Sequence, residues 1–78
     1  MEFTVYSKDN CPYCTKIKDV LRLTNQSFVE YKLNKDFTKY EFYEKFGNNG
    51  TFPQVLCGDV KLGGCTDTIK YLKEQKIV

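Results

Sequence analysis

Residues 3–14 read FTVYSKDNCPYC, and this stretch decides how the rest of the 78-residue chain is interpreted. Phe3 and Val5 alternate with other residues as in a short strand, and a polar segment follows them. Proline directly after Cys11 is favoured at the first position of a helix, because the N–H that it lacks would be unpaired there anyway. The stretch therefore predicts a strand, a loop and a helix with Cys11 and Cys14 at its start.

Beyond this start, residues suited to burial recur at steps of three and four, which is the spacing of one helical face. These residues are Cys14, Ile17, Val20, Leu21 and Thr24. We therefore expect Cys14 on the buried face of the helix and Cys11 at its open end.

The middle of the chain predicts a second strand and a second helix. Residues 28–33 are rich in aromatic and β-branched side chains, which favour a strand. Thr38 and Glu41 match a capping box at a helix start. We expect this helix to end at Gly47, before a loop at residues 48–50. Its apolar positions are Phe42, Tyr43 and Phe46.

The last part of the chain predicts a hairpin and a third helix. Residues 54–57 and 60–62 are short strands joined by the two-residue turn Gly58-Asp59. Gly63-Gly64 then breaks the chain, and Thr66 or Cys65 can cap the final helix. The apolar face of that helix carries Ile69, Leu72 and Tyr71.

The predicted order is strand, helix, strand, helix, strand, strand, helix. A helix between the first two strands implies a right-handed parallel crossover, and the tight turn makes the last two strands antiparallel. We therefore expect one α/β domain over residues 1–78. It contains a four-stranded mixed sheet with three helices on its faces (βαβαββα).

Composition excludes several classes of protein. The net charge is +2, and acidic residues are mixed among the lysines, so no basic stripe is present that would favour nucleic acid as a partner. No stretch approaches the roughly 18 apolar residues that span a membrane. The first residues carry no signal-peptide pattern, so we expect a cytoplasmic protein. Histidine is absent, which excludes Cys-His proteases, Ser-His-Asp hydrolases and His-ligated zinc sites.

The pair Cys11 and Cys14 is the strongest chemical signal in the chain. In a reducing compartment, four cysteines indicate redox catalysis or metal binding more than a structural disulfide framework. At a helix start the pKa of a thiol falls from about 8.5 to between about 3.5 and 7.5, and Lys8 adds a favourable charge. Cys11 is therefore the expected nucleophile, and Cys14 the thiol that resolves the resulting mixed disulfide.

A structural metal site is the alternative use of this pair. The remaining cysteines, Cys57 and Cys65, lack C-x-x-C spacing, which disfavours a metal. We expect Cys57 to be a small buried residue. Cys65 is expected to pack inertly, with oxidation under stress as the alternative.

Three motifs in order resemble those of the dithiol glutaredoxins, a family of the thioredoxin fold. They are Cys11-Pro12-Tyr13-Cys14 after a strand, then Thr51-Phe52-Pro53, then Gly63-Gly64-Cys65-Thr66-Asp67. The resemblance spans essentially the whole chain. Thioredoxins usually carry Gly-Pro between the cysteines after a tryptophan, and this chain has no tryptophan.

The resemblance implies a cis peptide bond before Pro53. The Phe52 backbone would then face outward and pair with a bound cysteinyl segment like an added strand. Phe52 stands where valine is commoner in the family, so we expect it to narrow or reshape the groove. A trans proline that opens an edge strand is the alternative.

The resemblance also implies a glutathione site. Its expected residues are Lys8, Tyr13, Phe52, Pro53, Gly64, Cys65, Thr66 and Asp67. Asp67 would pair with the ammonium of the γ-glutamyl end, whose carboxylate suits a helix N-terminus. Lys8 and Tyr13 would line the glycine end. Lys39 is either a further contact for that end or a solvated surface lysine.

The function implied is a glutathione-dependent thiol–disulfide oxidoreductase that reduces protein disulfides and protein–glutathione mixed disulfides. Glutathione is its co-substrate, and we expect no metal. By family analogy we expect ribonucleotide reductase among its clients, and we expect a monomer. One alternative is an iron–sulfur carrier that shares a cluster through Cys11 and two glutathiones, which Pro12 disfavours. Another is a protein recycled by thioredoxin reductase.

Overall fold

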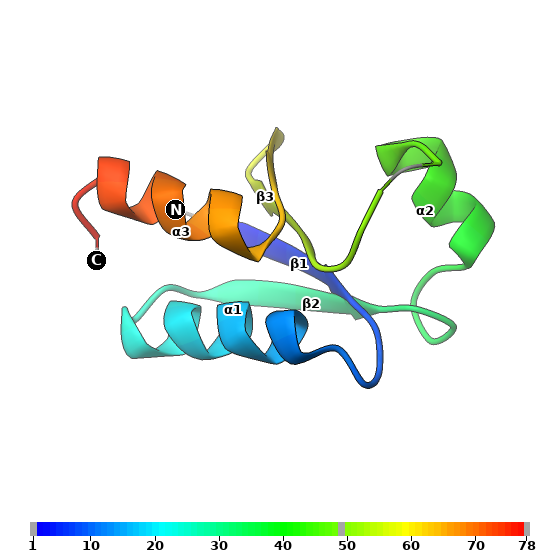
Figure 1. Ribbon diagram of the computed structural model, residues 1–78, viewed down its shortest axis with the longest axis horizontal. Coiled ribbons are helices and arrows are strands. Elements are labelled where there is room, and N and C mark those ends of the chain that lie inside the picture. Colours follow the sequence, from blue (N-terminus) through cyan, green and yellow to red (C-terminus); the bar gives the residue numbers. More distant parts are fainter. Residues whose placement is uncertain (1, 49, 78) are drawn as a thin grey trace.

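The computed structural model describes residues 2–48 and 50–77 (Figure 1). Its elements follow the predicted order: β1 (Phe3–Ser7), α1 (Pro12–Leu23), β2 (Phe28–Lys32), α2 (Lys39–Phe46), β3 (Gln54–Cys57), β4 (Val60–Gly63) and α3 (Cys65–Glu74). The predicted loop at residues 48–50 includes Asn49, which lies outside the described residues.

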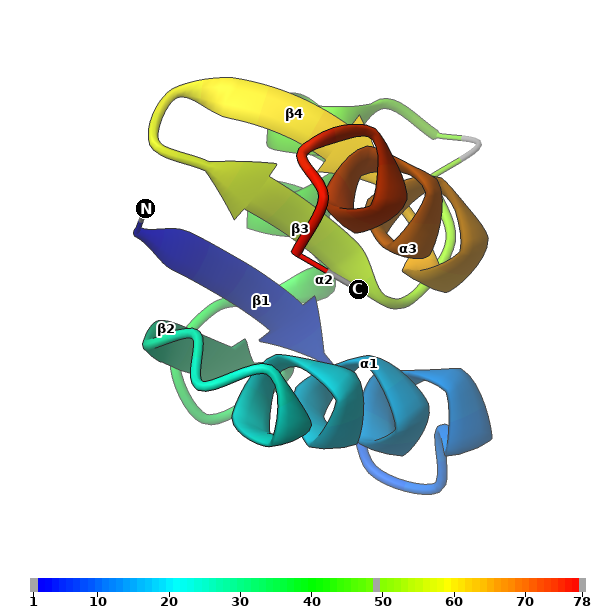
Figure 2. The ribbon, with the colours of Figure 1, turned by 90° about the vertical axis from the view of Figure 1, so that its left-hand side faces the viewer.

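The four strands form one mixed sheet in the order β2-β1-β3-β4. β1 runs parallel to β2, with Val5 opposite Glu30, and this confirms the predicted parallel pairing. β3 is antiparallel to β1, and β3 and β4 form the predicted antiparallel hairpin. The ribbon shows β1 in the interior of the sheet, next to both β2 and β3 (Figure 2).

The helices are divided between the two faces of the sheet. Figure 2 looks onto α1 and α3, which lie in front of the sheet, while α2 lies behind it. Side chains of β1, α1, β3 and α3 form the core between the sheet and the first pair of helices. Its fully buried members include Phe3, Val5, Ile17, Leu21, Val55 and Leu72. Alternation along β1 sends Phe3 and Val5 into this core and Tyr6 to the opposite face.

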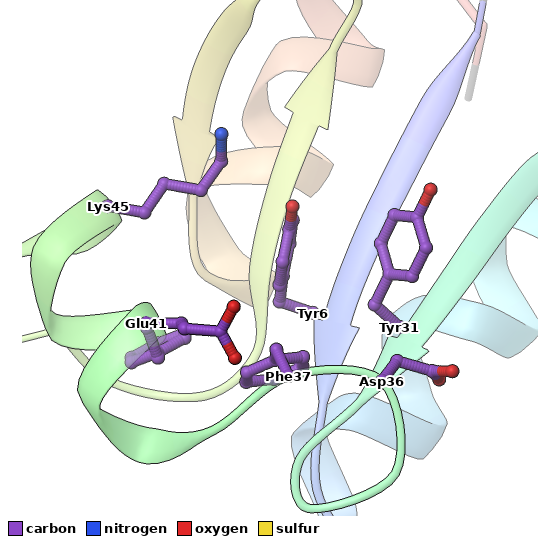
Figure 3. Close-up of a pocket in the computed structure, with 7 residues that line it drawn as sticks. Tyr6, Tyr31, Asp36, Phe37, Glu41 and Lys45 are labelled. Atoms are coloured by element: carbon purple, nitrogen blue, oxygen red, sulfur yellow. The ribbon is translucent and has the colours of Figure 1, made fainter.

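The face below α2 is built from aromatic rings. The Tyr6 ring contacts Phe37, Phe46 and Tyr31, with centroids 5.2, 5.1 and 5.4 Å away. A hollow of about 390 Å³ on this face is lined by Tyr6, Tyr31, Asp36, Phe37, Glu41, Phe42 and Lys45 (Figure 3). Phe37 and Phe42 are buried on this face, whereas Tyr40 is 72% exposed.

Local signals in the sequence set the ends of α1 and α2. The Thr38 hydroxyl accepts the N–H of Glu41, and the Glu41 carboxylate accepts the N–H of Thr38, which confirms the capping box. α2 ends with Gly47 as its C-cap. α1 buries Cys14, Ile17 and Leu21, whereas Val20 is half-buried and Thr24 is the C-cap.

The start of α3 differs from the prediction. Neither Cys65 nor Thr66 caps this helix: its N-cap is Gly64, which has no side chain for the purpose. The Cys65 side chain is buried in the core instead, because apolar contact there outweighs one capping hydrogen bond. β4 extends to Gly63, so the break falls one residue later than expected. Leu72 is buried, while Ile69 and Tyr71 are half-buried.

Candidate active site

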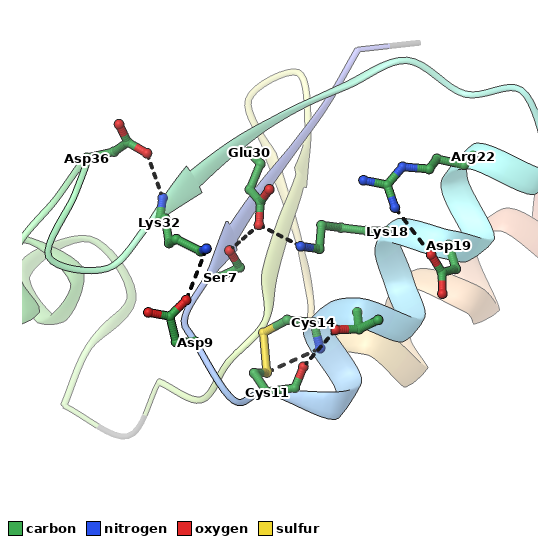
Figure 4. A network of polar contacts seen from close by, with 11 residues as sticks. Ser7, Asp9, Cys11, Cys14, Lys18, Asp19, Arg22, Glu30, Lys32 and Asp36 are labelled. Carbon is green, nitrogen blue, oxygen red and sulfur yellow. Dashed lines mark hydrogen bonds and ion pairs between the residues drawn. A yellow bond between two sulfur atoms is a disulfide. The ribbon is translucent and has the colours of Figure 1, made fainter.

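Cys11 and Cys14 are joined by a disulfide at the N-terminus of α1 (Figure 4). Cys11 is the N-cap residue, and its Cα lies 5.2 Å from that of Cys14. Cys14 is only 1% exposed, whereas Cys11 is half-buried. The structure thus has the predicted asymmetry, with one sulfur at the helix start and its partner on the buried face.

The sulfur of Cys11 takes the place of a capping oxygen. It accepts the backbone N–H of Cys14 at 3.2 Å. The first turn of α1 carries no acidic side chain. A helix N-terminus presents unpaired N–H groups and the positive end of the helix dipole, and both favour a negative charge on a capping atom. The environment of Cys11 therefore favours its thiolate when the disulfide is reduced.

A polar network that the sequence did not predict fixes the segment before Cys11. Ser7 is fully buried, and its hydroxyl donates to the Glu30 carboxylate. The Lys18 ammonium binds the same carboxylate at 2.8 Å (Figure 4). Asp9 pairs with Lys32 at 3.0 Å. The contacts of Ser7 and Asp9 tie the strand and loop that lead to the cysteines onto β2.

The Glu30 carboxylate is held in its charged form. Partial burial raises the pKa of Glu30, but hydrogen bonds from Lys18 and Ser7 and the charges of Lys18 and Lys32 outweigh it, so the pKa lies below the usual 4.5. The Asp9 carboxylate raises the pKa of Lys32, so this ammonium is also held in its charged form. No local spacing in the sequence indicates this network, because the partners of Glu30 lie 12 and 23 residues away from it.

The Phe52–Pro53 peptide bond is cis, as the resemblance implied. Pro53 is buried, and Phe52 is half-buried. Within residues 2–48 and 50–77, the N–H and C=O of Phe52 have no hydrogen-bond partner. These two backbone groups are therefore free to pair with a bound segment.

Seven of the eight expected glutathione-site residues line one hollow of about 250 Å³, here called the Phe52 hollow. It is lined by Tyr13, Thr51, Phe52, Pro53, Gly64, Cys65, Thr66 and Asp67. Thr51 belongs to the second motif and is a lining residue beyond the expected set. Three segments that are far apart in the sequence thus meet beside the first turn of α1.

Lys8, the eighth expected residue, lines a neighbouring hollow of about 580 Å³, here called the Cys11 hollow. Its other lining residues are Asp9, Asn10, Cys11, Pro12, Cys14, Thr15, Lys18 and Lys32. The structure does not bring Lys39 to either hollow: its ammonium lies over the Tyr43 ring, 5.6 Å from the centroid.

The other two thiols have different surroundings. Cys65 is 6% exposed at the base of the Phe52 hollow, and burial raises the pKa of its thiol despite the opposing charge of Lys16. Cys57 is half-buried, not fully buried as expected, and the Tyr71 hydroxyl donates to its sulfur at 3.9 Å.

Among the described residues, no three side chains of the metal-binding types come together. None of the helices in this part of the chain has the length and apolar character of a membrane span.

Exchange between thiols and disulfides needs one sulfur that ionises readily and a second within bonding reach of it. The first turn of α1 supplies both. Carried on a four-stranded mixed sheet beside a cis proline, this arrangement is that of the thioredoxin-fold thiol–disulfide oxidoreductases.

Comparison with known proteins narrows this class. The glutaredoxin family model matches residues 3–61. Glutaredoxin 1 of Rickettsia prowazekii is 31% identical over 75 residues, which cover 94% of this chain and 79% of that protein. Glutaredoxin 3 of Escherichia coli K12 is 33% identical over 63 residues, covering 81% of this chain and 76% of that protein. The chain belongs to the glutaredoxin family.

Solved structures agree on the fold. Reduced Escherichia coli glutaredoxin superposes with a TM-score of 0.83 at 22% identity and covers all of both chains. A buckwheat glutaredoxin–glutathione complex gives 0.79 at 22% identity, covering 96% of this chain and 71% of that one. The predicted fold class and the predicted oxidoreductase activity are both confirmed.

Proposed function

We propose that glutathione is the reductant and that the Phe52 hollow binds it. The observation that carries this proposal is the meeting of residues 13, 51–53 and 64–67 in one hollow beside the cysteines. Each part suits one group of the peptide. The N-terminus of α3 favours a carboxylate, the Asp67 carboxylate an ammonium, and the free backbone groups of Phe52 an extended cysteinyl residue. The buckwheat relative was solved with glutathione bound.

The chemistry proposed for mixed disulfides uses Cys11 alone. Its thiolate attacks the glutathione sulfur of a protein–glutathione disulfide, and the protein thiolate leaves and takes up a proton. A second glutathione thiolate then attacks the glutathione sulfur now bonded to Cys11. Oxidised glutathione leaves, and the Cys11 thiolate is restored.

Protein disulfides require Cys14 as well. Cys11 first forms a mixed disulfide with the client, and the second client thiol is released. Cys14, as its thiolate, then attacks the Cys11 sulfur, which frees the client dithiol and forms the Cys11–Cys14 disulfide. Two glutathione molecules reduce that disulfide and become oxidised glutathione. We propose that the chain acts in this way as a cytoplasmic monomer, with ribonucleotide reductase among its clients.

Coupled assays with two reductants test the glutathione proposal. We expect turnover when NADPH is supplied through glutathione and glutathione reductase, and none when thioredoxin reductase replaces them. Turnover with thioredoxin reductase alone would contradict the proposal.

Replacing Cys14 tests the roles of the two sulfurs. We expect Cys14→Ser to retain the removal of glutathione from proteins and to lose the reduction of protein disulfides. The companion variant Cys11→Ser should lose both reactions. If Cys14→Ser kept both reactions equally, Cys14 would not be the resolving thiol.

A further inference from the structure

The Phe52 side chain is part of an aromatic stack that reaches from the interior to the candidate active site. Its ring lies 4.2 Å from that of Phe42, at an interplanar angle of 14°, and 6.2 Å from that of Phe37, at 19°. Phe42 and Phe37 are 1% and 8% exposed. Two buried and nearly parallel rings therefore fix the orientation of the Phe52 ring.

The Lys8 ammonium lies over this ring, 5.4 Å from the centroid. The neighbouring carboxylate, on Asp9, pairs with Lys32. In the part of the chain that the structure describes, no carboxylate forms an ion pair with Lys8. The positive charge of Lys8 is thus placed by an aromatic face, which holds a cation without neutralising it.

This contact connects the two hollows beside the disulfide. Phe52 lines the Phe52 hollow, and Lys8 lines the Cys11 hollow together with both cysteines. A substrate whose sulfur reaches Cys11 from the Phe52 hollow therefore passes the Lys8 ammonium, which the Phe52 ring holds in place. A free lysine loses rotamer freedom when a ligand immobilises it, which weakens binding. A lysine already held over a ring loses less.

We propose that Phe52 is a positioning residue that holds Lys8 for a carboxylate of the substrate. Its ring thereby makes the enzyme selective for disulfides that carry a carboxylate close to the sulfur. The inference rests on the proposed function, because glutathione would supply that carboxylate through its glycine end.

A double-mutant cycle tests this inference. The variants are Phe52→Leu, Lys8→Met and both together, assayed on a peptide–glutathione mixed disulfide and on the same substrate with the glycine carboxylate amidated. We expect Phe52→Leu to raise KM for the first substrate about two- to five-fold, with little change in kcat. The double variant should be no worse than Lys8→Met alone. With the amide substrate, the effect of Phe52→Leu should disappear.

Two further variants separate this role from packing. Phe52→Tyr keeps an aromatic face and should restore a KM close to that of the unsubstituted chain. Tyr43→Leu is the matched control, because Lys39 lies over the Tyr43 ring in the same way but neither residue lines either hollow. This variant should leave KM unchanged. Urea unfolding of each variant shows whether it is folded under the assay conditions.

The possible failures are distinguishable. If glutathione does not support turnover of the unsubstituted chain, the proposed function fails. If it does, the inference is overturned by any of three results: Phe52→Leu has no effect on KM, it acts equally without Lys8, or it acts equally on the amide substrate.

Discussion

The Glu30 carboxylate connects three elements at one point. It receives the Ser7 hydroxyl from the end of β1 and the Lys18 ammonium from α1, while its own backbone belongs to β2. Lys18 and Glu30 side chains are 19% and 28% exposed, so solvent screens their attraction only in part. The pair therefore stabilises the geometry of the segment that leads to Cys11.

We predict that Glu30→Gln lowers the free energy of unfolding by about 1.5–3 kcal/mol near neutral pH, because Lys18 loses its charged partner. The pKa of Glu30 is lowered by folding, so its contribution is complete above the unfolded pKa near 4.5 and is lost as pH falls through the lower folded value. Urea unfolding of both proteins across this range should show the difference shrinking on acidification. A constant difference would contradict this role.

At the level of single residues, the sequence identified the two cysteines but not this network. Cys11 and Cys14 are read from local spacing, because a helix start determines what surrounds them. Ser7 and Glu30 are 23 residues apart, and Lys18 and Glu30 are 12 apart. Their contact depends on the pairing register of β1 and β2, which short strands of mixed polarity do not specify.

Gly63, which ends β4, and Gly64, the N-cap of α3, differ in whether they can be replaced by a residue with a side chain. Gly63 has φ +107°, and a Cβ there would lie 2.6 Å from the Asp67 carboxylate. Gly64 has φ −83°, and the nearest atom to a Cβ there would be the Pro53 carbonyl oxygen at 3.6 Å, an ordinary contact. Only Gly63 is therefore required for its backbone conformation.

We predict that Gly63→Ala lowers the free energy of unfolding by about 1–3 kcal/mol and displaces Asp67. The matched variant Gly64→Ala should change stability by less than about 0.5 kcal/mol. Urea unfolding measures both differences. Equal losses would mean that strain at Gly63 is not the cause.

Elements with a local capping signal were predicted most closely. Thr38 and Glu41 satisfy each other's backbone, so four consecutive residues are enough to locate the start of α2. The start of α3 depends instead on Cys65, whose burial among core residues is a tertiary effect. A sequence pattern that treats Cys65 as a capping residue cannot include that effect.

For the whole molecule, the free energy of unfolding is small, and it depends on the core between the sheet and the helices α1 and α3. A chain of 78 residues is stabilised by about 4–12 kcal/mol in total. Leu21 is fully buried in this core, whereas Leu23, two residues later on the same helix, is 83% exposed. The two leucines thus provide the same substitution in opposite environments.

We predict that Leu21→Ala lowers the free energy of unfolding by about 2–5 kcal/mol, a large part of the total. Leu23→Ala should change it by less than about 0.5 kcal/mol. Thermal or urea unfolding followed by circular dichroism provides the comparison. Similar losses for both variants would contradict the assignment of the core.

The order of elements and the direction of two strand pairs could be predicted, but the order of strands in the sheet could not. A crossover helix fixes β1 and β2 as parallel, and a two-residue turn fixes β3 and β4 as antiparallel. Whether β3 joins β1 or β2 depends on which pairing buries the apolar faces of α1 and α3 together. Side chains such as Val55 and Leu72, 17 residues apart in sequence, decide this only in the folded molecule.

The interior position of β1 has a consequence for synthesis on the ribosome. β2 follows β1 closely in the chain, but β3, its neighbour on the other side, begins only at Gln54. Until that segment emerges, one side of β1 has no partner, and Phe3–Ser7 contains no charged side chain that would keep another nascent chain away. A translational pause between the two segments would prolong this interval and so increase the exposure of β1 to aggregation during synthesis.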